Sequence, residues 1–232
     1  MEIHLAPEEI FKAGDFNITN TLIVSMAFLL LFFILSKKTS SNLKLVPGRL
    51  QNFFESLIEV IFNFMDGVLE DRGKTKKFFP LVATIFIFVI VSNWLEILPG
   101  SGSILVRSPS SDLNFTLAIA ISAVIGIQVF SITSIGLIKY IKRFINFSGP
   151  INFFVGILEL VSEAAKIVSF SFRLFGNIFA GEVLLIVMYF LAPYIIPLPF
   201  MILEIFVGFI QALVFSMLTL VFLKIGTAET EH

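Results

Sequence analysis

Five long stretches of this 232-residue sequence are poor in charge, and each is about as long as a lipid bilayer is thick. An α-helix rises about 1.5 Å per residue, so about 20 apolar residues cross a hydrocarbon core of about 30 Å. Inside that core every backbone N–H and C=O group must be bonded within the protein, and continuous apolar runs of this length achieve this as helices. The pattern predicts an all-α membrane protein with about five transmembrane helices.

The composition excludes several classes of protein. Hydrophobic residues make up 57% of the chain and charged residues 14%, whereas a globular domain has about a quarter charged residues. A soluble enzyme, a disordered protein and a nucleic-acid binder are therefore excluded. There is no cysteine, and the two histidines, His4 and His232, lie at opposite ends of the chain. We therefore expect no metal site, no cofactor and no catalytic site on this chain.

The sequence divides into one integral membrane domain, residues 1–232. Its predicted segments are a tail at 1–17, a first crossing at 18–36, an amphipathic helix at 47–71, a second crossing at 78–98, a third crossing at 113–138, a long helix or helix pair at 151–191 that contains the fourth crossing, a fifth crossing at 200–224 and a tail at 225–232. The stretch 47–71 is apolar on one face only, which predicts a helix that lies at the membrane surface or against a partner.

Basic residues in the loops predict the orientation of the chain. Eight of them lie between Lys37 and Lys77 and three lie between Lys139 and Arg143, whereas the opposite loops contain only Lys12 and Arg107. The positive-inside rule then places the N-terminus outside and the C-terminus in the cytoplasm. Five crossings, an odd number, likewise place the two termini on opposite sides of the membrane.

The fourth crossing carries a polar line along one face. At 100° per residue, six polar side chains lie within about 40° of one line: Glu159, Ser162, Lys166, Ser169, Arg173 and Asn177. Glu163 lies to one side, within reach of Lys166 at spacing i, i+3. An alternative explanation exists for Glu159, Glu163 and Lys166. Their flexible side chains could extend and place the charged groups at the cytoplasmic membrane interface.

Arg173 is the residue in this line that most needs an explanation. A charge at the bilayer centre costs about 2.5–3.5 kcal/mol on insertion scales. No acidic residue lies at i±3 or i±4, where the sequence has Ser169, Phe170, Gly176 and Asn177. Arg173 therefore indicates either a structural ion pair with another helix or an anionic ligand or partner that meets it within the membrane.

Two further carboxylates lie in the predicted outer half of the membrane. Glu182 is nine residues after Arg173, about 13.5 Å further out and about 180° around the helix. Glu204 and Gln211, seven residues apart in the fifth crossing, share a face. Polar contacts between helices could account for such residues, but an aqueous path open to the outside explains two intramembrane carboxylates better.

Several segments resemble one protein family. Residues 172–177 (FRLFGN) followed by 180–182 (AGE) closely resemble the signature of subunit a of the F-type ATP synthase membrane sector. Residues 108–114 (SPSSDLN) and Gln211 before 213–220 fit that family too, in the same order and over most of the chain. The resemblance implies a bacterial plasma-membrane stator with two offset half-channels, beside a rotating c-ring of small two-helix subunits and with the peripheral-stalk subunit b as a further partner. The last two crossings would form a long hairpin against that ring.

The resemblance also implies roles for particular residues. Arg173 would be the essential arginine, with Asn177, Glu182 and Gln211 as its companions in ion translocation. Glu204 occupies a position where the family varies among polar residues, often histidine. The family places Gln211 close to Arg173, whereas a turn between Pro193 and Pro199 leaves the two offset by about 10 Å along the helices.

Together these features predict a stator that conducts H⁺, with Na⁺ as the alternative ion. The ion enters along Glu182 and Glu204, and Glu159, Glu163 and Lys166 line an inner half-channel. Two other hypotheses remain at this point. One is a stand-alone secondary transporter in which Arg173 binds an anionic substrate, although no internal repeat supports it. The other is a structural membrane anchor whose buried charges serve assembly.

Overall fold

The computed structural model describes residues 9–13, 16–41, 44, 47–97, 108–144, 150–192 and 195–228. Five of its helices are long and apolar enough to cross a membrane, which confirms the predicted all-α membrane architecture. The helices are α1 (Asn20–Ser41), α2 (Arg49–Leu69), α3 (Arg72–Trp94), α4 (Leu113–Ile135), α5 (Leu137–Phe144), α6 (Pro150–Leu191) and α7 (Pro197–Thr227). Two 3₁₀ turns, η1 (Leu95–Ile97) and η2 (Pro109–Ser111), and a β-hairpin of β1 (Glu9–Ala13) and β2 (Phe16–Thr19) complete the structure.

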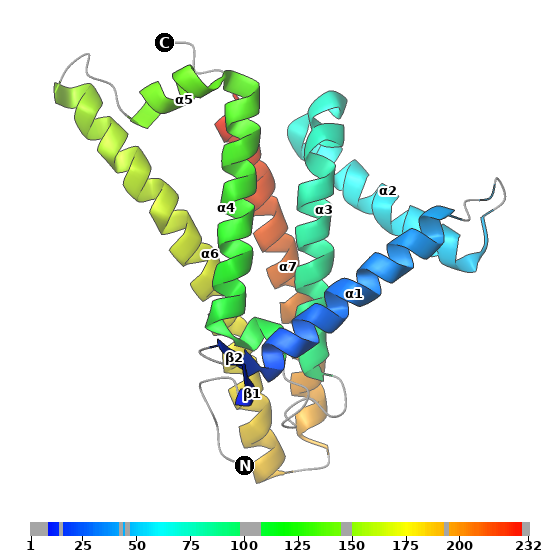
Figure 1. Cartoon of the computed structure of the whole chain (residues 1–232). Helices are drawn as coiled ribbons and strands as arrows, with labels where there is room; N and C mark the ends of the chain where they lie inside the picture. The colour runs from blue at the N-terminus through cyan, green and yellow to red at the C-terminus, as the bar shows by residue number, and fades with distance from the viewer. Residues whose placement is uncertain are drawn as a thin grey trace.

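The helices form a bundle with two distinct ends (Figure 1). The β-hairpin, η2 and the start of α7 lie at one end, which we call the hairpin end. The helix α5, the α2–α3 turn and the last residues of α7 lie at the other, which we call the α5 end. The predicted orientation would place the hairpin end outside the cell.

The β-hairpin corrects the predicted start of the first crossing. Residues 18 and 19 belong to β2, which pairs antiparallel with β1, so the first crossing begins at Asn20. The β-branched residues Ile18 and Thr19 favour this extended conformation. Part of the predicted tail at 1–17 is thus a hairpin, and its residues 1–8, 14 and 15 lie outside the described residues.

The helix α3 begins earlier than the crossing predicted at 78–98. Asp71 caps it, since its Oδ1 accepts hydrogen bonds from the backbone N–H groups of Gly73 (2.9 Å) and Lys74 (3.2 Å). Such a cap satisfies N–H groups that otherwise lack a partner at a helix start. The basic residues after Asp71 therefore lie in the first turns of α3 rather than in a loop. At the other end the α-helix stops at Trp94.

The predicted third crossing, 113–138, ends at Ile135. Gly136 has φ +91°, a backbone conformation that glycine adopts without steric penalty. The chain turns aside there into α5, a short amphipathic helix (Figure 1).

The helix α6 is unbroken over 42 residues, so the predicted stretch 151–191 is one helix and not a pair. It is about 63 Å long at 1.5 Å per residue, about twice the hydrocarbon thickness. It is inclined to α3 and α4 (Figure 1). The fifth crossing, predicted at 200–224, is the longer helix Pro197–Thr227, which begins with proline as helices often do. Residues 229–232 of the predicted inner tail lie outside the described residues.

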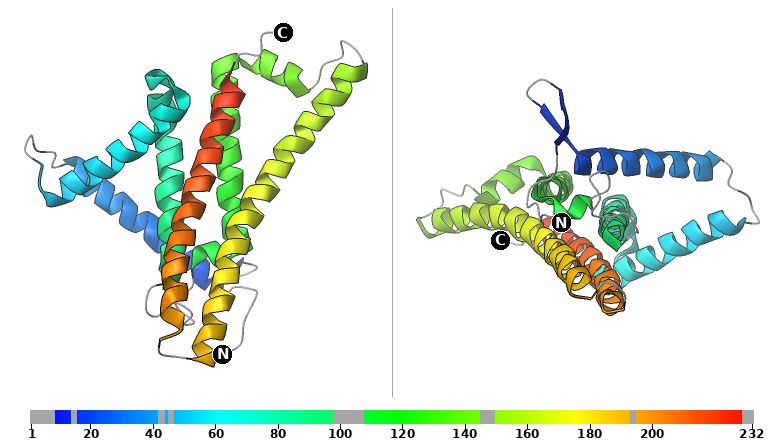
Figure 2. Two further views of the ribbon diagram at one scale, coloured as in Figure 1. Left: turned by 180° about the vertical axis from the view of Figure 1, so that it is seen from behind. Right: turned by 90° about the horizontal axis from the view of Figure 1, so that it is seen from below.

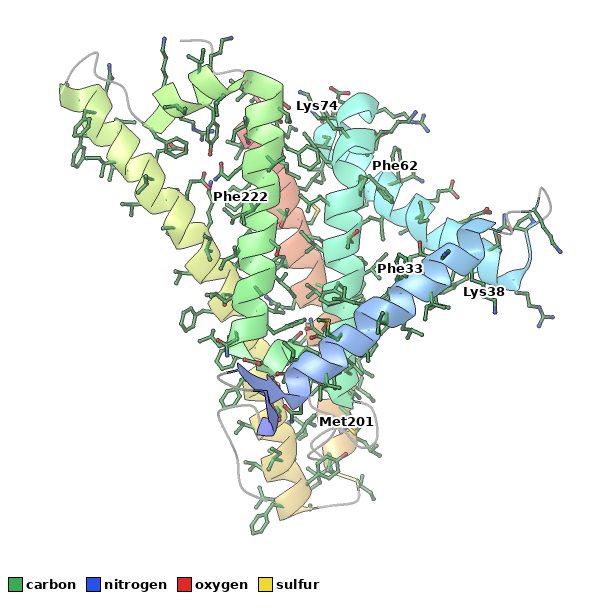
Figure 3. The ribbon with its side chains drawn as sticks, in the orientation of Figure 1. Phe33, Lys38, Phe62, Lys74, Met201 and Phe222 are labelled. Carbon is green, nitrogen blue, oxygen red and sulfur yellow. The ribbon has the colours of Figure 1, made fainter. Side chains whose placement is uncertain are left out.

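The core lies where α3, α4, α6 and α7 meet. Its buried residues include Val89, Ala120, Leu174, Phe215 and Leu220. The helices α1 and α2 extend to one side of this core, whereas α6 and α7 lie on another side (Figure 2). Phe33 and Lys38 lie on α1 where it points away from the bundle (Figure 3).

Candidate functional site

The α6–α7 hairpin aligns the polar residues of its two helices in one antiparallel register. The carboxyl group of Glu204 lies against Gly181, and Asn177 bonds to Gln211. Nearer the α5 end, the rings of Phe170 and Phe215 lie 4.8 Å apart, centroid to centroid. The two helices meet at the hairpin end and diverge toward the α5 end (Figure 2).

This register corrects the expected offset between Arg173 and Gln211. Gln211 contacts Asn177, which is one turn from Arg173, so the offset along α6 is about 6 Å and not about 10 Å. The reason is the position of the turn. Because α6 already ends at Leu191 and α7 begins at Pro197, Gln211 lies opposite a residue closer to Arg173.

Arg173 lies near the middle of α6 and is exposed on the surface of the chain. Its Nη2 is 3.5 Å from the hydroxyl of Ser169, one turn away. Among the described residues, no carboxylate lies within 4.0 Å of its guanidinium nitrogens. A permanently charged group thus projects from the apolar hairpin with no counter-charge within 4.0 Å in the part of the chain that the structure describes.

Asn177 and Gln211 form the polar contact nearest to Arg173 in the hairpin. The Nδ2 of Asn177 donates to the Oε1 of Gln211 over 2.7 Å. Gln211 is buried, with 4% of its surface exposed. This bond therefore fixes α6 and α7 at the level next to the arginine.

Asn177→Leu is expected to destabilise the hairpin, because it leaves the buried amide of Gln211 without a partner. The cost of such an unpaired group is about 1–3 kcal/mol, so the thermal unfolding temperature in detergent should fall. Asn152→Leu, which removes an exposed asparagine of the same helix, is the matched control. Equal shifts in the two variants would contradict the role of the Asn177–Gln211 bond.

Glu204 is the most deeply buried carboxylate of the hairpin, with 5% of its surface exposed. Its carboxyl group packs directly against the backbone of Gly181, where a Cβ atom would lie 2.2 Å from the Glu204 Cδ. Only glycine permits this approach. Glu182, the next residue of α6, is half-buried. Two carboxylates therefore lie in the part of α6 and α7 that is nearer the hairpin end of the bundle.

The sequence analysis missed two polar residues on the neighbouring elements. Asn93 of α3 donates from Nδ2 to the carbonyl oxygen of Gly208 over 2.9 Å, on the face of α7 that carries Glu204 and Gln211. Ser110 of η2 is fully buried. Asn93 is a polar residue within an apolar crossing, and Ser110 belongs to the segment 108–114 that resembles the family, but the sequence analysis gave neither residue a role.

Four buried polar atoms in this region have no hydrogen-bond partner among the described residues: Asn93 Oδ1, Ser110 Oγ, Glu204 Oε1 and Gln211 Nε2. Buried polar groups in native proteins are normally bonded to protein or to ordered water. These atoms, together with Glu182, therefore mark the part of the bundle that is best suited to hold water.

A second group of ionisable residues lies toward the α5 end. Arg143 of α5 pairs with Glu159 of α6 through Nη2 and Oε1. Lys166 pairs with Glu163, with 2.5 Å between Nζ and Oε1. All four residues are partly buried, so α5 covers the carboxylates that the sequence analysis assigned to an inner half-channel.

Arg173 separates these two groups along α6. Asn177, Glu182 and the Gly181–Glu204 contact lie four to nine residues toward the hairpin end, or about 6–13.5 Å. Lys166, Glu163 and Glu159 lie seven to fourteen residues toward the α5 end, or about 10–21 Å. The chain therefore presents two polar regions, one on each side of an exposed cation.

Comparisons with known proteins agree with the resemblance seen in the sequence. Residues 19–224 match the family model described as ATP synthase A chain. A protein of Pelobacter propionicus named ATP synthase subunit a 3 is 37% identical over 98% of this chain and 94% of its own length. The ATP synthase subunit a of Moorella thermoacetica is 32% identical over 95% of this chain and 96% of its own length. The ATP synthase subunit a of Geobacter sulfurreducens is 33% identical over 98% of this chain and 94% of its own length. This chain belongs to the ATP synthase A chain family.

Proposed function

We propose that this chain is the stationary membrane subunit of an ATP synthase, in which proton translocation drives the rotation of a ring of small two-helix subunits. Family membership and the five apolar helices support a multi-pass subunit of the ATP synthase membrane sector. The proposal that proton translocation drives rotation depends mainly on Arg173. It is an exposed cation on an apolar hairpin, and no carboxylate among the described residues lies within 4.0 Å of it.

The negative group that neutralises Arg173 then comes from another polypeptide. A charge in hydrocarbon is costly, and arginine does not lose its proton in proteins. A ring of subunits that each carry one membrane carboxylate supplies this counter-charge repeatedly. Arg173 stabilises each carboxylate in its ionised form as it passes. The fixed positive charge also repels protons, so it prevents a direct leak between the two polar regions.

The polar region at the hairpin end serves as the outer half-channel in this proposal. Protons enter along Glu182 and Glu204 and pass the exposed amide of Asn177 and the buried amides of Gln211 and Asn93. There a proton neutralises a ring carboxylate, which can then face lipid without the penalty of a buried charge.

The polar region at the α5 end serves as the inner half-channel. The ring carboxylate releases its proton there, near Glu159, Glu163 and Lys166, after the ring has turned. Each unit charge that crosses the membrane gains about 2.3 kcal/mol per 100 mV of potential. The ion is H⁺, with Na⁺ as the alternative, and this chain needs no cofactor and has no catalytic site of its own. In this proposal it lies in the bacterial plasma membrane, with its N-terminus outside, and also contacts subunit b.

Reconstitution distinguishes this function from the two alternatives. A stand-alone transporter would move an anionic substrate into liposomes that contain this chain alone. A structural anchor would tolerate neutral replacements of its buried charges without loss of transport. We expect instead that the chain copurifies with a ring of two-helix subunits and that proton flux requires both. Transport by the isolated chain would refute the proposal.

Glu182→Gln is expected to slow proton conduction more than Glu159→Gln. Glu182 lies half-buried on the proposed outer path and can relay protons, a step that typically contributes at least about 100-fold when a positioned group carries it. Glu159 is held by Arg143. Proton pumping by inverted membrane vesicles, normalised to the amount of assembled complex, measures both effects. Glu59→Gln, at an exposed position of α2, is the control; equal or reversed effects of the first two variants would contradict the outer path.

A further inference from the structure

Two cations, Lys166 and Arg173, lie on the same line of α6 but differ in their exposure and in their contacts. Lys166 is seven residues before Arg173, so the two are about 20° apart around the helix and about 10 Å apart along it. Arg173 is exposed, and its nearest polar contact is the hydroxyl of Ser169. The side chain of Lys166 is 15% exposed and is surrounded by partners.

A second accessible cation would interfere with the proposed function, on which this inference rests. A ring carboxylate that moves past α6 is attracted by every positive charge on the face it passes. Screening by solvent is weak inside the membrane, so such attraction extends over about 10 Å. An unpaired ammonium group at Lys166 would hold the carboxylate ionised at a second position, on the side where the carboxylate has to leave.

The contacts of Glu163 neutralise this ammonium group. Its Oε1 lies 2.5 Å from the Nζ of Lys166, and its Oε2 accepts a hydrogen bond of 2.7 Å from the Nε2 of Gln128 on α4. The Oε1 of Gln128 in turn accepts a hydrogen bond from the hydroxyl of Tyr140 on α5. Both carboxylate oxygens are therefore occupied, and three helices hold the carboxylate in place.

Tyr140 keeps its role as a donor over the cellular pH range. Burial, followed by the nearby negative charge of Glu163, raises the pKa of the Tyr140 hydroxyl above its ordinary value of 10.0, although Arg143 opposes the shift. The hydroxyl therefore stays protonated at neutral pH.

The ammonium group of Lys166 is also turned toward α7. Its Nζ lies 4.5 Å from the centroid of the Phe222 ring, and Phe222 belongs to the part of the bundle nearer the α5 end (Figure 3). A cation over an aromatic face is attracted by the ring's negative face. Lys166 thus points into the α4–α6–α7 contact, whereas Arg173 stays exposed.

We propose that Glu163, held by Gln128 and Tyr140, is a positioning residue that neutralises Lys166, so that Arg173 is the cation on this line of α6 that a ring carboxylate meets. In this arrangement Glu163 does not carry protons. Its negative charge matters only because Lys166 is positive. The proposal therefore separates Glu163 from Glu159, which pairs with Arg143 of α5 instead.

A double-mutant cycle in the whole ATP synthase tests this proposal. Glu163→Gln should lower proton pumping by inverted membrane vesicles about fivefold or more, since it removes the counter-charge of Lys166. Lys166→Gln alone should have a smaller effect. The double variant Glu163→Gln/Lys166→Gln should recover the activity of Lys166→Gln, because no cation then needs neutralising. If the double variant is as impaired as Glu163→Gln, Glu163 carries protons itself and the proposal is wrong.

A milder variant keeps the test informative if Glu163→Gln fails to assemble. Tyr140→Phe removes only the hydroxyl that holds Gln128, so pumping should fall about twofold, and Lys166→Gln should cancel that loss. An unchanged loss in Tyr140→Phe/Lys166→Gln would overturn the proposal. Arg173→Ala is measured beside these variants. Retained pumping in Arg173→Ala would refute the proposed function. If Arg173→Ala loses pumping but Lys166→Gln fails to rescue Glu163→Gln and Tyr140→Phe, only the inference about Glu163 is refuted.

Discussion

An ATP synthase that carries Arg173→Ala is expected to lose ATP-driven proton pumping. Without the guanidinium group, an ionised ring carboxylate has no counter-charge within the membrane. A charge there costs about 2.5–3.5 kcal/mol, which corresponds to a fall in rate of about a hundredfold. The measurement is the acidification of inverted membrane vesicles, normalised to assembled complex.

Assembly should survive this change, because Arg173 is exposed and its polar contact within the chain is the 3.5 Å contact with Ser169. Arg49→Ala, which removes an exposed arginine of α2, controls for the loss of positive charge. Arg173→Lys should recover only part of the activity, since a lysine is a compact point charge on a flexible stem and cannot bind a carboxylate in the two-pronged manner of arginine. Coupled ATP synthesis by Arg173→Ala at the normal rate would refute the assignment.

The line of polar residues around Arg173 could be predicted from the sequence because it lies on a single helix. Helical periodicity alone determines which side chains of α6 share a face. The number of crossings was predictable for a similar reason, since lipid requires long apolar helices. Both predictions depend on local spacing and on the solvent, and neither depends on how helices pack.

Contacts between helices could not be predicted in this way. The hydrogen bonds from Asn93 to Gly208 and from Gln128 to Glu163 join residues far apart in the sequence. They depend on the rotation and offset of each helix, which the apolar faces alone do not determine. The two-residue difference at each end of the α6–α7 turn shows how sensitive such offsets are, because it moves Gln211 to the level of Asn177.

Some helix ends were predictable and were missed. Asp71 is a favourable N-cap residue, and it precedes the basic residues that form the first turns of α3. Gly136 was a comparable signal within an apolar stretch. In both places the apolar pattern and the local signal disagreed. The local signal determined where α3 begins and where α4 ends.

Gly181→Ala is expected to destabilise the assembled subunit and to abolish most proton pumping. A Cβ atom at this position would clash with the carboxyl group of Glu204, so this buried carboxyl group would have to leave the contact or α6 and α7 would have to move apart. Such overpacking costs about 1–3 kcal/mol, which thermal unfolding in detergent detects. Gly67→Ala, where nothing lies within 4 Å of the added carbon, is the matched control and should leave both stability and pumping unchanged.

Changes at Glu204 separate the packing of this contact from its chemistry. Glu204→Gln keeps the size of the side chain and removes its ability to carry a proton, so we expect a stable complex whose pumping falls by at least about tenfold. Gly181→Ala/Glu204→Ala makes room for the added methyl group, so its stability should return to that of Glu204→Ala while pumping stays low. If this double variant pumps protons at the normal rate, Glu204 serves only to fill the space beside Gly181. The outer path would then have to depend on Glu182 alone.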